Sequence, residues 1–235
     1  LGITEDNFLG KGQQLKFQSN FGDEFTAYDI SFAEPYLYGR DLYIKTDLYS
    51  ELQDSATVNY ETEKIGFGLA LGFPLSYDQR ITTKYAIFND KTTADVDATS
   101  YEKLLAGTTT VSSVGYSFSS DKRNSPYKPS AGYKYILNQD LAGLGGDSFY
   151  IKSTIDYTYY KRISRSLIGS LKLNGGHVNG YNNKYAPISS YFDLGGNKLR
   201  GFQSQRVGPK TGNSYTGGQY FYLLSTETNI DLPIE

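Results

Sequence analysis

The stretch from 193 to 210 carries the side chains of this sequence that are best suited to a specific interaction. Its triplet Arg200-Gly201-Phe202 places a guanidinium with five hydrogen-bond donors beside a flexible joint and an apolar ring. A guanidinium binds a carboxylate in bidentate fashion, and a ring packs against an apolar wall. The triplet is therefore suited to a loop enclosed in a cavity, with Arg200 bound to an acid of the surrounding wall.

Turn-forming residues around the triplet predict that this loop has a fixed shape. Glycine adopts backbone angles that are closed to other residues, and a Gly-Pro pair is a turn signal. The candidate functional residues are Gly195, Gly196, Arg200, Gly201, Phe202, Gln203, Gly208 and Pro209. As the wall acid we predict Glu227, because it is the single acid of the next predicted strand (219–230). The alternative is that Glu227 is a solvated carboxylate at the rim.

Residues for bond-making chemistry are scarce. His177 is the one histidine, so a Ser-His-Asp arrangement would have to use it, and the glycines and asparagine around it predict an exposed loop tip. The sequence has no cysteine, no metal-ligand spacing, no Walker loop and no dinucleotide fingerprint. Two carboxylates of a β-barrel hydrolase could pair, but no spacing singles out such a pair. We therefore expect a protein that is not an enzyme, with no metal and no cofactor.

Composition favours a membrane barrel over a soluble globule. Hydrophobic residues make up 38% of the 235 residues, whereas Tyr contributes 23 and Gly 25. A soluble domain needs more apolar side chains to offset chain entropy, but a transmembrane β-barrel needs only an apolar outer face. No apolar run approaches the roughly 18 to 20 residues of a membrane helix. A net charge of −2 provides no basic field for nucleic acid.

The clearest strand pattern spans 64–73. Ile65, Phe67, Leu69, Leu71 and Phe73 alternate with Lys64, Gly66, Gly68, Ala70 and Gly72. A period of two sends successive side chains to opposite faces of a sheet. We predict that the large residues face lipid, and that the small ones face a lumen where they leave room for an inserted loop.

The same period recurs along the chain and predicts about ten strands. Their ranges are 13–20, 26–34, 42–49, 64–73, 81–87, 107–119, 133–137, 148–160, 167–173 and 219–230. We expect polar connections at 50–58 and 89–105, and a turn at 121–130. The fold class predicted is all-β, an antiparallel transmembrane β-barrel with a long lumenal loop before the last strand.

Ten charged residues share the predicted lumenal face of these strands. They are Lys16, Asp29, Lys45, Asp47, Lys64, Lys84, Lys134, Lys152, Asp156 and Lys172. They could form the selectivity lining of a channel, or they could simply hydrate a wide barrel, and we prefer the second interpretation.

Three runs in one order, Gly195-Gly196, 199–204 and 207–210, resemble the signature lumenal loop of the bacterial surface antigen family. Pro35-Tyr36 and the spacing of prolines and charges from Asp121 to Gly132 resemble other parts of that family. The resemblance implies a partial barrel domain over 1–235, about ten of an expected sixteen strands, without periplasmic repeat domains. It also implies that an acid at the position of Glu227 receives Arg200.

The function that the resemblance implies is insertion of β-barrel proteins into the bacterial outer membrane, without catalysis. The implied partners are unfolded outer-membrane β-barrel polypeptides, accessory lipoproteins and the lipid bilayer, but no nucleic acid. Three alternatives stay open: a sister translocase with fewer substrates, a passive porin, and a soluble β-sandwich binding module.

Overall fold

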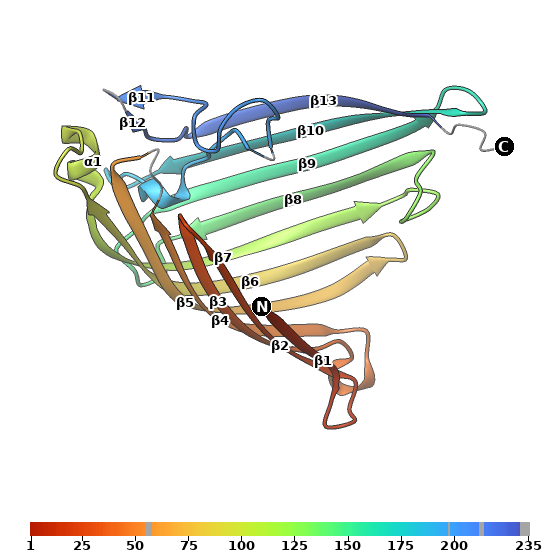
Figure 1. The fold of residues 1–235 in the computed structure, drawn as a ribbon. Helices are drawn as coiled ribbons and strands as arrows, with labels where there is room; N and C mark the ends of the chain where they lie inside the picture. The colour runs from red at the N-terminus through yellow and green to blue at the C-terminus, as the bar shows by residue number, and fades with distance from the viewer. Residues whose placement is uncertain (55–57, 197, 212–213, 231–235) are drawn as a thin grey trace.

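The computed structural model describes residues 1–54, 58–196, 198–211 and 214–230. It shows one antiparallel sheet of eleven strands in the order β1 to β10 and then β13 (Figure 1). From β1 to β10 each strand pairs with its neighbour in the sequence. The strands are β1 (Gly2–Phe8), β2 (Gln13–Gly22), β3 (Phe25–Glu34), β4 (Tyr43–Asp54), β5 (Tyr60–Ser76), β6 (Gln79–Ala94), β7 (Gly107–Asp121), β8 (Gly132–Ala142), β9 (Tyr150–Arg162), β10 (Leu167–Gly180) and β13 (Tyr220–Ile230). The all-β prediction is confirmed, with eleven strands in this sheet where about ten were expected.

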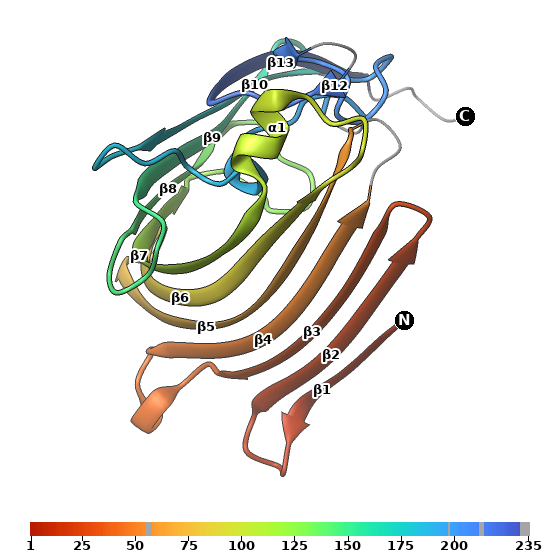
Figure 2. The ribbon, with the colours of Figure 1, turned by 90° about the vertical axis from the view of Figure 1, so that its left-hand side faces the viewer.

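The sheet is rolled into an open trough with β1 and β13 at its two edges (Figure 2). A second, two-stranded sheet pairs β11 (Lys210–Thr211) with β12 (Ser214–Tyr215). Two short 3₁₀ turns, η1 (Leu37–Gly39) and η2 (Ile188–Ser190), lie in connections. No helix in the part of the chain that the structure describes is both long enough and apolar enough to cross a membrane.

Strand pairing confirms the two predicted faces of β5. On one face, Lys64 donates a hydrogen bond to the carbonyl of Ser189, which belongs to the connection enclosed by the sheet. On the other face, Ile65 and Leu71 are exposed at 54% and 40%. When the pairs are followed from strand to strand, all ten charged residues predicted to face the lumen share the face of Lys64. The alternation therefore separates a lipid face from a polar, concave face.

The small residues of β5 have a different role from the one predicted. A Cβ at Gly66 would lie 2.4 Å from the Cβ of Phe88 and 2.8 Å from the hydroxyl of Tyr49, and at Gly68 it would meet the carboxylate of Asp47. The space over these glycines is filled by large side chains of the neighbouring strands β4 and β6. The enclosed connection contacts β5 further along, at Lys64.

Several predicted connections are in fact regular structure. β4 continues to Asp54 and β6 to Ala94, while residues 55–57 of the predicted 50–58 connection lie outside the described residues. The predicted 89–105 connection contains the helix α1 (Ser100–Leu105), which begins with a capping box between Thr99 and Glu102. His177 lies within β10, where its ring stacks on Tyr220 at 4.5 Å between centroids. The prediction of an exposed loop tip at His177 is wrong because the strand continues through the glycines.

The turn between β7 and β8 is closed by a bidentate ion pair. Arg123 donates from Nε and Nη2 to the two carboxylate oxygens of Asp121, at 2.7 and 2.6 Å. Gly132 has a φ of +97°, and a Cβ there would lie 2.1 Å from the carbonyl oxygen of Lys122. The spacing from Asp121 to Gly132 noted in the sequence is therefore the geometry of one rigid turn.

Candidate functional site

The connection between β10 and β13, here called the lumenal loop (181–219), folds back along the concave side of the sheet (Figure 2). Isolated bridges pair Phe192 with Gly218 and Leu194 with Val207, so the loop has a ladder of its own. The Phe192 bridge is formed by two backbone hydrogen bonds, of 2.8 and 2.9 Å. The predicted long lumenal loop before the last strand is therefore present and ordered by its own backbone pairing.

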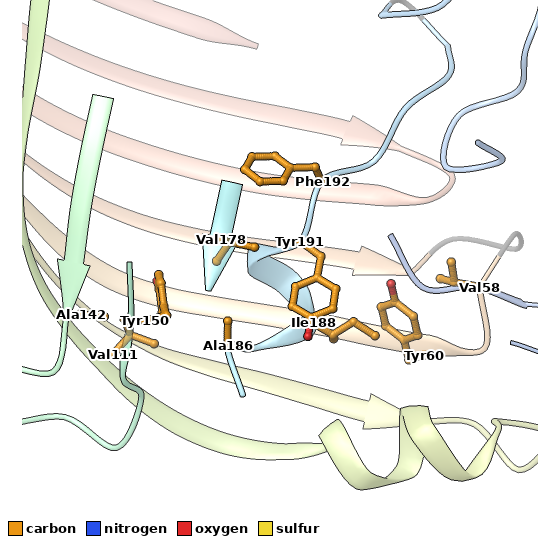
Figure 3. Close-up of a cluster of buried hydrophobic side chains, with 10 residues drawn as sticks. All are labelled: Val58, Tyr60, Val111, Ala142, Tyr150, Val178, Ala186, Ile188, Tyr191 and Phe192. Atoms are coloured by element: carbon orange, nitrogen blue, oxygen red, sulfur yellow. The ribbon is translucent and has the colours of Figure 1, made fainter. Parts of the chain in front are cut away.

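Buried apolar side chains join the loop to the wall of the trough (Figure 3). The cluster contains Val58, Tyr60, Val111, Ala142, Tyr150, Val178, Ala186, Ile188, Tyr191 and Phe192. The wall residues come from β5, β7, β8, β9, β10 and the segment just before β5, and the last four residues come from the loop. Burial of this apolar surface favours the docked loop.

A polar clamp holds η2 at the same place. Lys152 donates a 2.8 Å hydrogen bond to the carbonyl of Ser190, and Lys64 donates a 3.2 Å bond to the carbonyl of Ser189. The hydroxyl of Ser189 donates to the carboxylate of Asp90, which is 3% exposed. Three strands, β5, β6 and β9, are thereby tied to one turn of the loop. We call Lys64, Asp90 and Lys152 the η2 clamp.

The predicted glycines impose the shape of the loop. Gly195 has a φ of +114°, and a Cβ there would lie 2.0 Å from the carbonyl oxygen of Gln203. Gly196 follows with a φ of +57°, and its N–H donates to the carbonyl of Phe202 at 2.8 Å. Gly201 and Gly208 have φ of +88° and +138°, in the left-handed region that favours glycine. Pro209 accepts a 3.3 Å bond from the N–H of Thr216.

Arg200 lies on the lumenal side but does not have the predicted partner. It lines a pocket together with Glu227 and Lys172. Within the described residues, however, Glu227 forms its ion pair with Lys172 at 2.8 Å, and Arg200 forms no ion pair. Lys172 is well placed to pair with Glu227 because it lies on the adjacent strand β10, one diagonal position away on the same face. The predicted pair of Arg200 and Glu227 is therefore replaced by a cross-strand pair.

The apolar anchor of the loop is Phe192 rather than Phe202. The Phe202 side chain is 54% exposed, whereas Phe192 is 8% exposed. The Phe192 ring packs 4.8 Å from the ring of Phe221 in β13, and the ammonium of Lys152 lies 4.8 Å above it. Phe221 faces inward and meets Phe192 at the base of the loop. The sequence signal for Phe192 was only an apolar pair, Tyr191-Phe192, among polar residues.

Asp193 is the half-buried acid at the base of the glycine turn. Burial raises the pKa of Asp193, while hydrogen bonding to Gln205, whose amide lies 3.5 Å away, opposes that rise. No group of three or more His, Cys, Asp or Glu in the described ranges could hold a metal ion. The contact between loop and wall is built from aromatic packing, lysine-to-carbonyl bonds and glycine turns.

Comparison with known proteins identifies the family of this sheet and loop. The Omp85 superfamily domain matches residues 7–235. The chain belongs to the Omp85 superfamily. A crystal structure of BamA from Haemophilus ducreyi lacking POTRA domains 1–3 superposes with a TM-score of 0.89 and 21% identity, covering 100% of this chain and 50% of that one. The family resemblance stated for the loop sequence is thus confirmed, with BamA among the matched proteins, and the fold is that of an outer-membrane β-barrel portion.

Two kinds of curated relative match almost the whole chain. The sorting and assembly machinery component 50 homolog of Mus musculus is 26% identical over 235 residues, which is 99% of this chain and 50% of the relative. The outer membrane protein assembly factor BamA of Neorickettsia risticii is 25% identical over 242 residues, which is 99% of this chain and 32% of the relative. The chain spans about half or less of the length of these relatives.

Proposed function

We propose that this chain is the barrel portion of an insertase that folds β-barrel proteins into an outer membrane. The observation that carries the proposal is the lumenal loop, which is clamped to the concave wall by Lys64, Asp90 and Lys152 in a chain of the Omp85 superfamily. Relatives in two kingdoms are named for assembly, as an outer membrane protein assembly factor and as a sorting and assembly machinery component. Their names support an assembly role for the complete protein.

The work of such a protein is non-covalent. An exposed strand edge in lipid leaves backbone N–H and C=O groups unpaired at a cost of several kcal/mol each, so an incoming strand that pairs with them is strongly favoured. We assign the present sheet and loop the role of a stiff wall that keeps its curvature while strands are added at a seam elsewhere in the complete barrel. The partners proposed are unfolded outer-membrane β-barrel polypeptides, accessory lipoproteins and the bilayer.

The test measures insertion by the complete protein in proteoliposomes, with a urea-denatured outer-membrane barrel as substrate. Phe192→Ala removes the aromatic contact that joins the loop to β13. We expect the variant to remain membrane-inserted, as judged by heat-modifiable migration on a gel, but to fold substrate more slowly than the parent. Phe202→Ala is the matched control, because its half-exposed ring makes no ring contact among the described residues. Equal losses in both variants, or no loss in either, would count against the proposal that the docked loop acts as a brace, which keeps the wall of the barrel stiff.

The same reconstituted protein distinguishes the insertase from two other functions, a passive porin and a sister translocase. A passive porin requires a large, steady, ion-selective conductance in planar bilayers, and the lysine-rich concave face would then be its lining. A sister translocase would show the insertion activity with a single passenger and not with a panel of barrels. We propose the insertase over the porin because the loop occupies the concave space that a wide pore would need. We propose it over the translocase because the matched relatives are named for assembly.

The membrane that we propose is the bacterial outer membrane. The solved BamA barrel that superposes on the whole chain is bacterial, and the signature loop is that of a bacterial family. The animal relatives make an organellar outer membrane the alternative. Expression in a bacterium with its own assembly factor depleted separates the two, since only a chain adapted to the bacterial machinery should restore growth.

A further inference from the structure

A cluster of tyrosines lies on the lipid-facing side of β8 and β9, close to the short turns. Strand pairing places Tyr133 opposite Tyr159, and Tyr135 opposite Tyr157, all on the outer face with Leu137. The Tyr133 ring lies 6.1 Å from that of Tyr135 and 6.2 Å from that of Tyr157. The outward positions beside the β5–β6 turn hold Phe73 and Ile81 instead, which have no hydroxyl. The outward strand positions beside the β5–β6 turn therefore do not repeat the cluster.

Three of the four hydroxyls of this cluster have no protein partner within the described residues. Within the described ranges, Tyr135, Tyr157 and Tyr159 make no side-chain hydrogen bond, whereas the hydroxyl of Tyr133 lies beside Lys122. An outward hydroxyl in hydrocarbon is costly unless it reaches a polar group. Three such hydroxyls together require polar groups supplied from outside the protein.

Two cations extend the cluster toward the turn between β9 and β10. Lys161 follows Tyr159 on the same outer face, about 7 Å further along the strand. Arg165 lies in the turn itself, both side chains are exposed, and no acid occurs from 160 to 167. No ion pair of either cation is found among the described residues. In contrast, Arg80 beside the β5–β6 turn is paired with Asp41 at 3.1 Å.

The depth of Lys161 matches the headgroup layer. The residues of β9 that face outward run from Ile151 to Lys161. These two residues are ten positions apart, which is a distance of about 34 Å along the strand. At a strand tilt of about 40° this path rises about 26 Å, close to the roughly 25 Å apolar band of an outer-membrane barrel. If Ile151 lies at one edge of the band, Lys161 lies at the other, next to phosphate groups.

We propose that Tyr159, together with Lys161 and Arg165, binds the phosphate headgroup of an anionic phospholipid in the leaflet at the short-turn end. The phosphate oxygens accept a hydrogen bond from the Tyr159 hydroxyl and form charge-assisted bonds with the two cations. Anionic lipid is the occupant because the patch presents unpaired positive charge on a face that the fold directs toward the bilayer. This inference goes beyond the insertase function and does not depend on it.

The test is native mass spectrometry of the complete protein released from mixed micelles of phosphatidylglycerol and phosphatidylcholine. The variant combines Lys161→Gln with Arg165→Gln. Each cation near an anionic surface contributes about 1 kcal/mol, which corresponds to about fivefold in binding. We expect retention of phosphatidylglycerol relative to phosphatidylcholine to fall about fivefold for each cation removed. Tyr159→Phe should lower the same ratio by a smaller factor.

The matched control is Lys91→Gln, since Lys91 also faces outward but at the opposite end of β6, paired with Glu63 at 3.4 Å. It should leave the lipid ratio unchanged, and folded fractions of all variants are compared by heat-modifiable migration. A parent protein without preference for phosphatidylglycerol would overturn the proposal. An unchanged lipid ratio in the double variant, with weaker retention of an accessory protein, would equally overturn it and identify the patch as a protein interface.

Discussion

Placing an arginine at the centre of the lipid-facing stripe tests the assignment of the two faces directly. The outer face of β5 carries Glu61 and Glu63 at one end and then an apolar stripe from Ile65 to Phe73. Leu69 is four residues from either end of that stripe, or about 14 Å along the strand and about 10 Å along the membrane normal at a 40° tilt. It therefore lies at the midplane, where Arg costs about 2 to 4 kcal/mol.

Leu69→Arg should therefore lower the free energy of unfolding of the complete protein by about 2 to 4 kcal/mol, measured by urea titration in phosphatidylcholine vesicles. Two controls separate the effect of the face of the sheet from the effect of depth in the membrane. Ser117→Arg places the same side chain on the concave face between Thr82 and Asn138, and Thr93→Arg places it on the outer face opposite Glu61, near the headgroups. Each control should cost at most about 1 kcal/mol. A Leu69→Arg cost no larger than that of Ser117→Arg would refute the assignment of faces.

Three further perturbations address the loop and its wall. Ser204→Cys, on the lumenal loop, should react slowly with bulky impermeant maleimides added outside intact cells, and rapid labelling would place the loop outside. A double-mutant cycle of Lys172→Ala with Glu227→Ala should give a coupling below about 1 kcal/mol, because both side chains are partly exposed, at 37% and 48%; a coupling well above this would indicate a buried network. Gly195→Ala should destabilise the docked loop by about 1 to 3 kcal/mol in proteolysis assays, and Gly201→Ala, which meets no atom within 4 Å, should cost less.

The sheet could be predicted from sequence because lipid and lumen impose opposite demands on successive residues. A shift of one residue in any strand would turn its charges toward lipid, so an alternation such as Ile155-Asp156-Tyr157 fixes the face of a strand. The ends of strands were less predictable. Beyond the membrane both faces meet water, and the period of two fades, as it does from Asn89 to Ala94. The helix α1 had a readable signal in Thr99 and Glu102, a capping-box spacing.

The contacts of the loop could not be predicted in the same way. Phe192 lies between Tyr191 and Asp193, and Phe202 between Gly201 and Gln203, and neither shows a period that indicates which one packs. The η2 clamp joins residues separated by up to 125 positions, such as Lys64 and Ser189. Such contacts depend on the curvature of the whole sheet, which no local pattern encodes. The glycines were predictable because their requirement is local: Gly195 adopts a φ that disfavours other residues.

The two halves of the loop therefore have different physical roles. Its base, from Ala186 to Phe192, is buried and tied to strands on both sides of the trough, so undocking it would expose apolar surface and leave Asp90 without its Ser189 hydroxyl. Its apex, from Arg200 to Gln203, is exposed and held mainly by its own glycine turns. A brace needs only the base to be fixed. Since Arg200 forms no ion pair among the described residues, the apex is not latched to the wall at the Lys172–Glu227 pair that it lies beside.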